Sequence, residues 1–216
     1  MPETAIVAGV GPTIGEAVAR RFHDAGMNVA LLARSTDHIE DLAAELGERA
    51  LAVRADVTDQ DAVAAAAESV RGAFGRVSVL VCNAAAGGGA PLAETTPEQF
   101  EQTWRVRAYG SFLLVQAVRE DLLDTGGTVL FSGTTYATQP TPEQVSWGSA
   151  APATRGLART LNEAMDGVHV CYVRIGTAVR PEPSPVAVGS EVVAERYLEL
   201  VEQETATTPE ALLERP

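Results

Sequence analysis

The sequence predicts a doubly wound α/β fold, in which helices cover both faces of a mostly parallel sheet. Short valine-rich apolar runs, typical of buried strands, alternate with segments whose apolar residues recur at helical spacing. Strands that alternate with helices pair in parallel through right-handed crossovers. The 216 residues, 46% of them hydrophobic, contain no repeat or interdomain linker. We therefore expect a single domain over residues 1–216, with three layers in the order αβα.

The first half of the chain is expected to alternate strictly between strands and helices. Either Thr58 or Asp59 can cap the third helix, because both side chains accept hydrogen bonds from backbone N–H groups. The predicted strands are 4–8, 28–33, 50–54 and 77–81, and the predicted helices are 14–22, 36–46 and an alanine-rich one that ends near residue 74.

The second half of the chain is expected to hold longer helices. Pro181, Pro183 and Pro185 predict an irregular connection before the last helix. The predicted helices are 97–123, 144–165 and 190–202, and the predicted strands are 128–131, 168–173 and a short one at 212–213.

The charge and cysteine content narrow the classes of partner. The net charge is −13, and every basic residue is an arginine. Such an acidic protein repels nucleic acids and anionic membranes, so we expect neither as a partner. Cys82 and Cys171 are too few to predict a disulfide scaffold or a metal site. No apolar stretch approaches the roughly 18–20 residues that cross a bilayer. Residues 1–3 do not form the basic segment that precedes the apolar part of a secretory signal, so we expect a cytoplasmic protein.

A glycine-rich turn lies between the first strand and the first helix. It contains Gly9, Gly11 and Gly15, which let the backbone approach a ligand without a Cβ in the way. The order strand, glycine turn and helix gathers free N–H groups and the positive end of the helix at one point. The turn therefore predicts a phosphate-binding site.

Several motifs together resemble the short-chain dehydrogenase/reductase family over essentially the whole chain. They are the turn Gly9…Ile14-Gly15, the run Ala55-Asp56-Val57, the run from Leu80 to Ala85, the helix from Trp104 to Gly110, and the closing run from Glu210 to Pro216. The resemblance implies a seven-stranded Rossmann-type sheet. It also implies hydride transfer between NAD(P) and an alcohol or carbonyl. Family members often form homodimers or homotetramers through the two long helices, which here are 97–123 and 144–165.

The same resemblance assigns residues to a dinucleotide site. Thr13 stands where the family usually has a third glycine, and we expect strain and weaker or shifted pyrophosphate binding if this position needs a positive φ. Arg34 resembles the arginine that binds the 2′-phosphate of NADP. A preference for NAD would need a carboxylate at that strand end to accept a ribose hydroxyl, and the sequence has none there. The implied cofactor residues are Gly9, Gly11, Thr13, Ile14, Gly15, Arg34, Asp56, Val57, Asn83 and Ala84.

Three of these assignments have simpler alternatives. Arg34 is also compatible with an ordinary surface arginine, since one guanidinium is not a binding site. Asp56, implied to lie against the adenine, is also a possible helix cap. Asn83, implied on the ribose side, is also a possible loop hydrogen-bonding residue.

The positions implied to be catalytic depart from the family pattern. Trp147 stands where the family has its proton-transferring tyrosine, and Ala151 stands where the lysine four residues later should be. Thr134 takes the place of the serine that holds the substrate oxygen, and Arg107 that of the helix asparagine. An indole N–H only donates and does not ionise near neutral pH, so Trp147 cannot exchange a proton.

Tyr136 is the candidate substitute for the missing acid, with Arg107 or Arg155 expected nearby, although a structural ring that covers the cleft is the alternative. Tyr109 and Tyr172 are the other phenols expected near the cleft, and the three histidines are expected far from it.

Two functions follow from this pattern. The first is an NADP(H)-dependent oxidoreductase of a small carbonyl or alcohol with a non-standard site. The second is an inactive member that acts as a nucleotide sensor or partner subunit.

Overall fold

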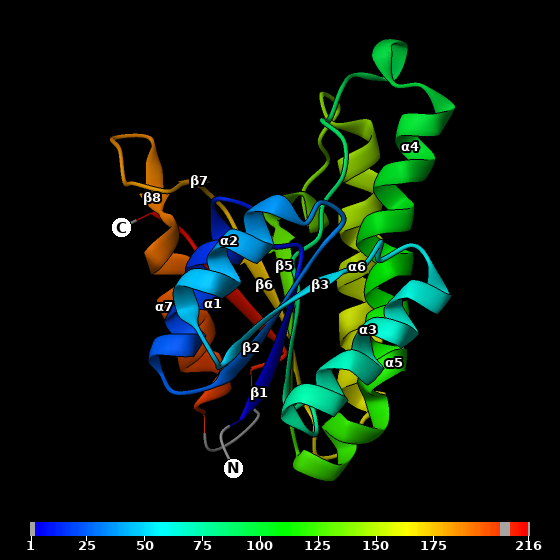
Figure 1. Cartoon of the computed structure of the whole chain (residues 1–216). Coiled ribbons are helices and arrows are strands. Elements are labelled where there is room, and N and C mark those ends of the chain that lie inside the picture. The colour runs from blue at the N-terminus through cyan, green and yellow to red at the C-terminus, as the bar shows by residue number, and fades with distance from the viewer. Residues whose placement is uncertain (1–2, 204–207, 216) are drawn as a thin grey trace.

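A seven-stranded, entirely parallel sheet forms the centre of the molecule, in the order β3-β2-β1-β4-β5-β6-β9. The computed structural model (Figure 1) describes residues 3–203 and 208–215. The order confirms the predicted Rossmann-type, doubly wound fold. The strands are β1 (Thr4–Ala8), β2 (Asn28–Ala33), β3 (Ala50–Arg54), β4 (Val79–Cys82), β5 (Thr128–Thr134), β6 (His169–Ile175) and β9 (Glu210–Leu213).

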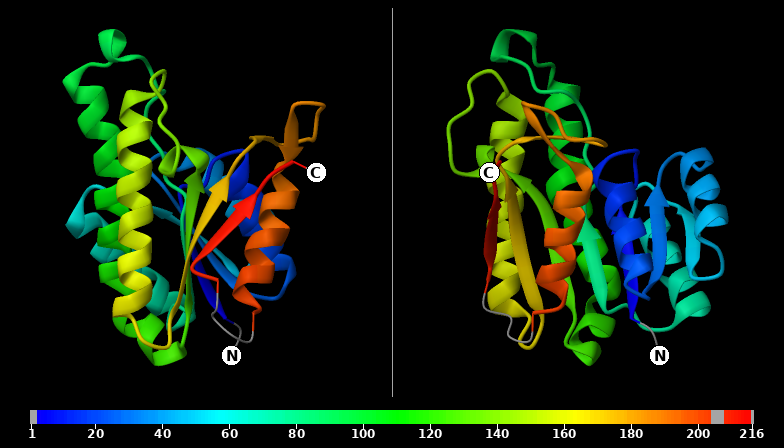
Figure 2. Two further views of the ribbon diagram at one scale, coloured as in Figure 1. Left: turned by 180° about the vertical axis from the view of Figure 1, so that it is seen from behind. Right: turned by 90° about the vertical axis from the view of Figure 1, so that its left-hand side faces the viewer.

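Helices cover both faces of this sheet, as the views in Figures 1 and 2 show from three sides. One layer packs on the apolar cluster that contains Phe22 and Tyr197, and the other on the cluster that contains Phe131 and Leu122. The first layer consists of α1 (Ile14–Asp24), α2 (Asp37–Leu46) and α7 (Ser190–Val201). The second layer consists of α3 (Gln60–Phe74), α4 (Pro97–Trp104), α5 (Gly110–Thr125) and α6 (Val145–Ala164).

Local sequence signals explain where two helices begin. The Asp59 side chain accepts hydrogen bonds from the N–H groups of Asp61 and Ala62, so Asp59 and not Thr58 caps α3. Helix α4 begins with a proline in its first turn, and Thr96 and Gln99 form a reciprocal capping box before it.

The structure differs from the prediction in two stretches. The helical segment 97–123 is interrupted by the π-helical turn η2 (Arg105–Tyr109), whose extra residue per turn leaves the apolar spacing nearly unchanged. The proline-rich connection contains a parallel pair, β7 (Ala178–Arg180) and β8 (Ala187–Gly189), outside the main sheet. Strands of three residues are too short to show alternation.

The strand order reverses beside β1, which is flanked by β2 and β4. Ligands of open α/β sheets bind in the crevice at such a switch point, beyond the carboxyl ends of the strands. The glycine turn after β1 and the loop after β4 both lie there. The Asn83 side-chain amide donates a hydrogen bond of 2.8 Å to the Gly9 carbonyl and joins these two loops.

Candidate active site

Three glycines of the turn after β1 have different structural roles. Gly9 has a φ of +99°, and a Cβ added there would lie 2.4 Å from the Ala84 backbone nitrogen. A Cβ on Gly15 would lie 2.4 Å from the Gly9 carbonyl oxygen. A Cβ on Gly11 would meet no atom within 4 Å. Gly9 and Gly15 therefore allow close packing of the chain, whereas Gly11 faces open space.

Thr13 is not strained in this turn. Its φ is −138°, and no residue other than glycine has a positive φ in the part of the chain that the structure describes. The condition under which strain was expected at Thr13 is therefore not met, and sequence alone does not show the backbone conformation. The Thr13 side chain makes no capping hydrogen bond, so the first turn of α1 has no side-chain acceptor from its N-cap.

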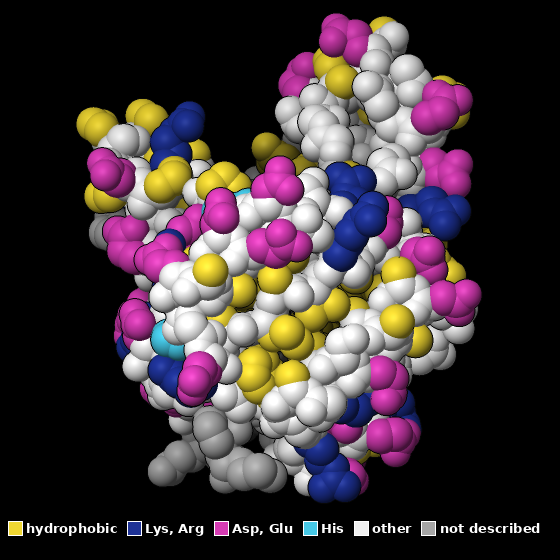
Figure 3. All heavy atoms as spheres, in the orientation of Figure 1, with side chains coloured by type: hydrophobic (Ala, Val, Ile, Leu, Met, Phe, Trp, Pro, Cys, Tyr) yellow, Lys and Arg dark blue, Asp and Glu magenta, His cyan; other side chains and the backbone are white. Residues whose placement is uncertain are grey.

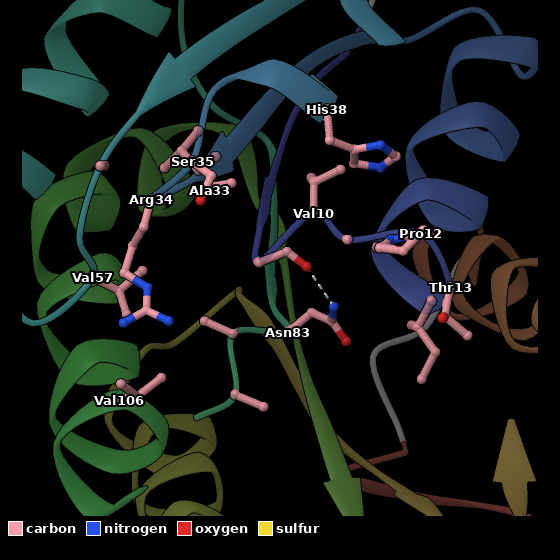
Figure 4. Close-up of a pocket in the computed structure, with 18 of the residues that line it drawn as sticks. Val10, Pro12, Thr13, Ala33, Arg34, Ser35, His38, Val57, Asn83 and Val106 are labelled. Carbon is pink, nitrogen blue, oxygen red and sulfur yellow. Dashed lines mark hydrogen bonds between the residues drawn. The ribbon is translucent and has the colours of Figure 1, made fainter. Parts of the chain in front are cut away.

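A cavity of about 560 Å³ opens over this turn, and Figure 4 shows it. All the cofactor residues predicted from the sequence line it. In Figure 4, the Arg34 side chain lies on the opposite side of the cavity from Pro12 and Thr13 and extends toward Val57. The structure thus brings together the predicted residues; their roles in binding stay predictions.

The polar residues of this cavity have defined partners. The Asp56 carboxylate accepts hydrogen bonds from the Thr58 N–H (2.9 Å) and hydroxyl (2.8 Å). Partial burial opposes ionisation of Asp56, but these two bonds together with the positive charges of Arg34 and Arg105 outweigh it and lower the pKa of its carboxyl. Asp56 therefore forms a local turn and does not cap α3. Asn83 lines the cavity and also makes the loop hydrogen bond with Gly9, so its two interpretations are compatible.

His38 also lines this first cavity, a position that the sequence did not predict, and it does not line the cavity of Thr134 and Tyr136 described below. Its Nε2 lies 3.3 Å from a Glu16 carboxylate oxygen, and Figure 4 shows its ring beside Val10 and Pro12. The start of α2 folds back over the glycine turn and brings His38 to this cavity. Its place four residues after Arg34 was the available signal.

A second cavity, of about 460 Å³, adjoins the first. Its lining includes the predicted residues Arg107 from η2, Thr134 from β5, Tyr136 from the short helical turn η3 (Thr135–Ala137), and Trp147 from α6. The two cavities share part of their lining and so form one groove along the carboxyl edge of the sheet. The shared residues are Ile14, Asn83, Ala85 and Val179.

Arg107 and Trp147 pack against each other in the second cavity. The guanidinium carbon lies 4.3 Å from the centre of the indole ring, a cation–π contact. One Arg107 Nη donates to the Ser132 carbonyl at 3.1 Å, but its Nε and the Trp147 indole N–H are buried without a hydrogen-bond partner. Burial lowers the pKa of Arg107, opposed by its contacts with Tyr172 and Tyr197.

Thr134 and Tyr136 provide the other polar groups. The Thr134 hydroxyl oxygen accepts a hydrogen bond from the Tyr136 N–H at 3.4 Å, which leaves its own proton for a ligand. Of the two arginines that were alternatives near Tyr136, Arg107 lines this cavity, whereas Arg155 does not and pairs with Glu210 at 2.7 Å.

The other phenols expected near the cleft do not line either cavity. Tyr172 is buried in the wall, where its hydroxyl accepts from the Thr134 N–H at 3.2 Å and donates to the Ala151 carbonyl at 3.5 Å. Tyr172 is therefore near the cleft as expected, although its ring does not reach the lining, and Tyr109 lines neither cavity. Tyr136 is the one phenol in the lining of the second cavity.

Two structural features are absent from residues 3–203 and 208–215. No helix among them is long and apolar enough to pass through a bilayer. No three of their His, Cys, Asp or Glu side chains are placed to hold a metal ion together.

Residues 3–180 match the family model described as short chain dehydrogenase. D-threitol dehydrogenase of Mycolicibacterium smegmatis is 34% identical over 128 residues, which are 58% of this chain and 49% of that protein. 7alpha-Hydroxysteroid dehydrogenase of Escherichia coli K12 is 29% identical over 161 residues, 73% of this chain and 63% of the relative. The chain thus spans about half to two thirds of the length of these relatives.

A solved structure agrees over the whole fold. The alcohol dehydrogenase of the archaeon Thermococcus sibiricus, complexed with 5-hydroxy-NADP, superposes with a TM-score of 0.90 and 27% identity. The match covers 100% of this chain and 99% of that one.

Proposed function

Because this chain belongs to the short-chain dehydrogenase/reductase family, we propose that it is an NADP(H)-dependent oxidoreductase. It interconverts a small carbonyl compound and the corresponding alcohol. The observation that carries the proposal is the single groove, in which the cavity over the glycine turn continues into the cavity of Thr134 and Tyr136. The relatives' names as dehydrogenases and the NADP analogue bound to the solved relative support it.

The residues of the first cavity fit a dinucleotide. The open space at Gly11 and the helix terminus at Thr13 suit a pyrophosphate, which needs close backbone approach and N–H donors. Arg34 forms no ion pair with a carboxylate of the described chain, so its guanidinium is available for a 2′-phosphate. Asp56 and Asn83 provide hydrogen-bond acceptors for the adenosine end.

The residues of the second cavity have separate roles in the proposed reaction. A bound reduced nicotinamide would supply the hydride that adds to the carbonyl carbon. The Thr134 hydroxyl holds the carbonyl oxygen by a hydrogen bond while negative charge develops there, and the Arg107 guanidinium supplies a positive charge in the same cavity. The Tyr136 hydroxyl gives this oxygen its proton and recovers one from water. Trp147 excludes water from one face of the guanidinium.

Calorimetric titration with NADPH and NADH tests the cofactor assignment. We expect tighter binding of NADPH, and Arg34→Gln should remove this preference by weakening NADPH about tenfold, the loss of one charge-assisted hydrogen bond. Arg76→Gln is the matched control, since Arg76 is exposed and paired with Asp124. An unchanged preference in Arg34→Gln would contradict the assignment.

Turnover of NADPH with ketones and aldehydes tests the reaction. We expect consumption of NADPH with at least one of these carbonyl compounds. Binding of NADPH without turnover of any compound would contradict the enzyme proposal for that panel and favour a sensor or partner subunit.

We also propose a homo-oligomer formed through α4 and α5. Phe100, Trp104 and Phe112 are exposed large hydrophobic residues on these two helices. An exposed group of large apolar side chains is typical of a surface that binds another protein.

A further inference from the structure

Arg107 is a buried cation without a compensating anion. The residue is 6% exposed, and no carboxylate among residues 3–203 and 208–215 forms an ion pair with it. Other arginines of the described chain, such as Arg71 and Arg155, are paired with Asp121 and Glu210. Of the residues that line the second cavity, Arg107 is the one with a charged side chain.

The surroundings of Arg107 do not neutralise its charge. The Ser132 carbonyl and the Trp147 ring contribute partial charges only. Burial raises the pKa of the neighbouring Tyr172 and Tyr197 phenols, which therefore stay neutral. The Arg107 Nε, also buried, has no hydrogen-bond partner. A buried charge that is neither paired nor fully hydrogen-bonded is costly, so the site is suited to an anion.

We propose that Arg107 binds a carboxylate of the substrate, next to the carbonyl group that is reduced. This inference rests on the proposed function and names its substrate class: 2-oxo acids and the corresponding 2-hydroxy acids. A single guanidinium balances one negative charge, which is that of a carboxylate, whereas a phosphate ester carries more. The planar guanidinium also matches the geometry of a carboxylate.

The position of Thr134 supports the same class of substrate. Arg107 contacts the carbonyl of Ser132, and Thr134 follows two residues later on the same strand. Two residues of a strand span about 6–7 Å. Arg107 and Thr134 both line the second cavity, so a carboxylate and an adjacent carbonyl of one substrate can contact them side by side. The reduction adds a hydride to C2 and a proton to the C2 oxygen, which yields a 2-hydroxy acid and leaves the carboxylate unchanged.

The test compares acids with their neutral methyl esters by calorimetry. The probes are 2-oxobutanoate and 2-oxopentanoate with their methyl esters, each titrated into the protein alone and in the presence of NADPH. We expect both acids to bind at least roughly tenfold more tightly than the esters, as loss of a hydrogen bond to a charged group predicts. Arg107→Met should abolish this preference. Arg119→Met, which removes an exposed arginine of α5 paired with Glu120, should keep it.

Two results would overturn the inference. The first is that the acids bind to the unchanged protein no better than the esters, or do not bind at all. The second is that Arg107→Met still prefers the acids. If Arg107→Met does not fold by circular dichroism, the comparison of acid and ester in the unchanged protein decides. Failure of NADPH to bind contradicts the proposed function instead, while the titrations without cofactor still report on Arg107.

Discussion

Tyr136 is the side chain on which proton transfer depends in this account. It is the phenol that lines the second cavity, whose lining also includes Trp147, the residue that the resemblance places at the position of the family's acid. We predict that Tyr136→Phe lowers kcat by about 10²- to 10⁴-fold, the usual contribution of a general acid. Initial rates at saturating NADPH measure this effect. Tyr109→Phe, which removes a hydroxyl outside both cavities, should leave kcat unchanged, and undiminished turnover in Tyr136→Phe would refute the role of this phenol.

At the scale of single residues, motifs identified which side chains line the groove but not how they interact. Positions such as Arg34 and Thr134 could be predicted because fixed spacings to the strand ends carry the resemblance. The contact between Arg107 and Trp147 could not, since these residues come from different helical segments. The backbone angle of Thr13 and the place of His38 also depend on tertiary structure, which spacing does not encode.

Glu210 links strand β9 to neighbouring elements by ion pairs, in addition to the backbone pairing of β9 with β6. This carboxylate pairs with Arg155 of α6 and Arg174 of β6, each at 2.7 Å, and is 17% exposed. We predict that Glu210→Gln lowers the free energy of unfolding by about 1–3 kcal/mol, because both guanidinium groups lose a charged acceptor. Urea denaturation measures the change.

Glu195→Gln is the matched control for this change. Glu195 pairs with Arg21 on the exposed surface, where an ion pair contributes about 0–1 kcal/mol. If both variants lose equal stability, Glu210 has no special role in holding β9.

Most elements could be predicted because their periodicity is strong. The strands and helices of the predicted fold lie within a few residues of the expected ranges. The last strand begins at Glu210, before the predicted 212–213, because its pairing with β6 and not its apolar residues sets its start. The π-helical turn that carries Arg107 was missed, since one extra residue hardly alters an apolar pattern.

At the scale of the whole molecule, the surface combines dispersed charge with exposed apolar side chains. Figure 3 shows acidic side chains spread over one face, and an open notch between α4 and the β7–β8 segment. The net charge of −13 favours solubility. The exposed hydrophobic residues of α4 and α5 interrupt this polar surface.

We predict that the protein is a dimer or tetramer and that Trp104→Glu dissociates it. Trp104 is 43% exposed on α4, and a carboxylate there would be buried against the partner in the assembly. Size-exclusion chromatography with light scattering measures the mass. Leu212→Glu places the same charge at an exposed leucine of β9 and should preserve the assembly. A monomeric unchanged protein would contradict the prediction.

The order of the strands explains why distant sequence motifs form one groove. Because β1 lies between β2 and β4, the glycine turn, Arg34 and Asn83 meet at one edge of the sheet. The sequence predicted this convergence, because it predicted the fold class that brings these motifs together. The assignment of a substrate did not, because it depends on the unpaired charge of Arg107.

The affinity of Gly11→Ala for NADPH tests the central claim, that this groove binds a dinucleotide, most directly. A methyl group at Gly11 meets no protein atom within 4 Å and would occupy the space given to the pyrophosphate. We predict that the melting temperature stays unchanged while the Kd for NADPH rises roughly tenfold or more, a loss of about 1.4 kcal/mol. Gly72→Ala, on the exposed side of α3, should bind NADPH like the unchanged protein. Equal affinity for NADPH in Gly11→Ala and the unchanged protein, or no binding by the latter, would contradict the claim.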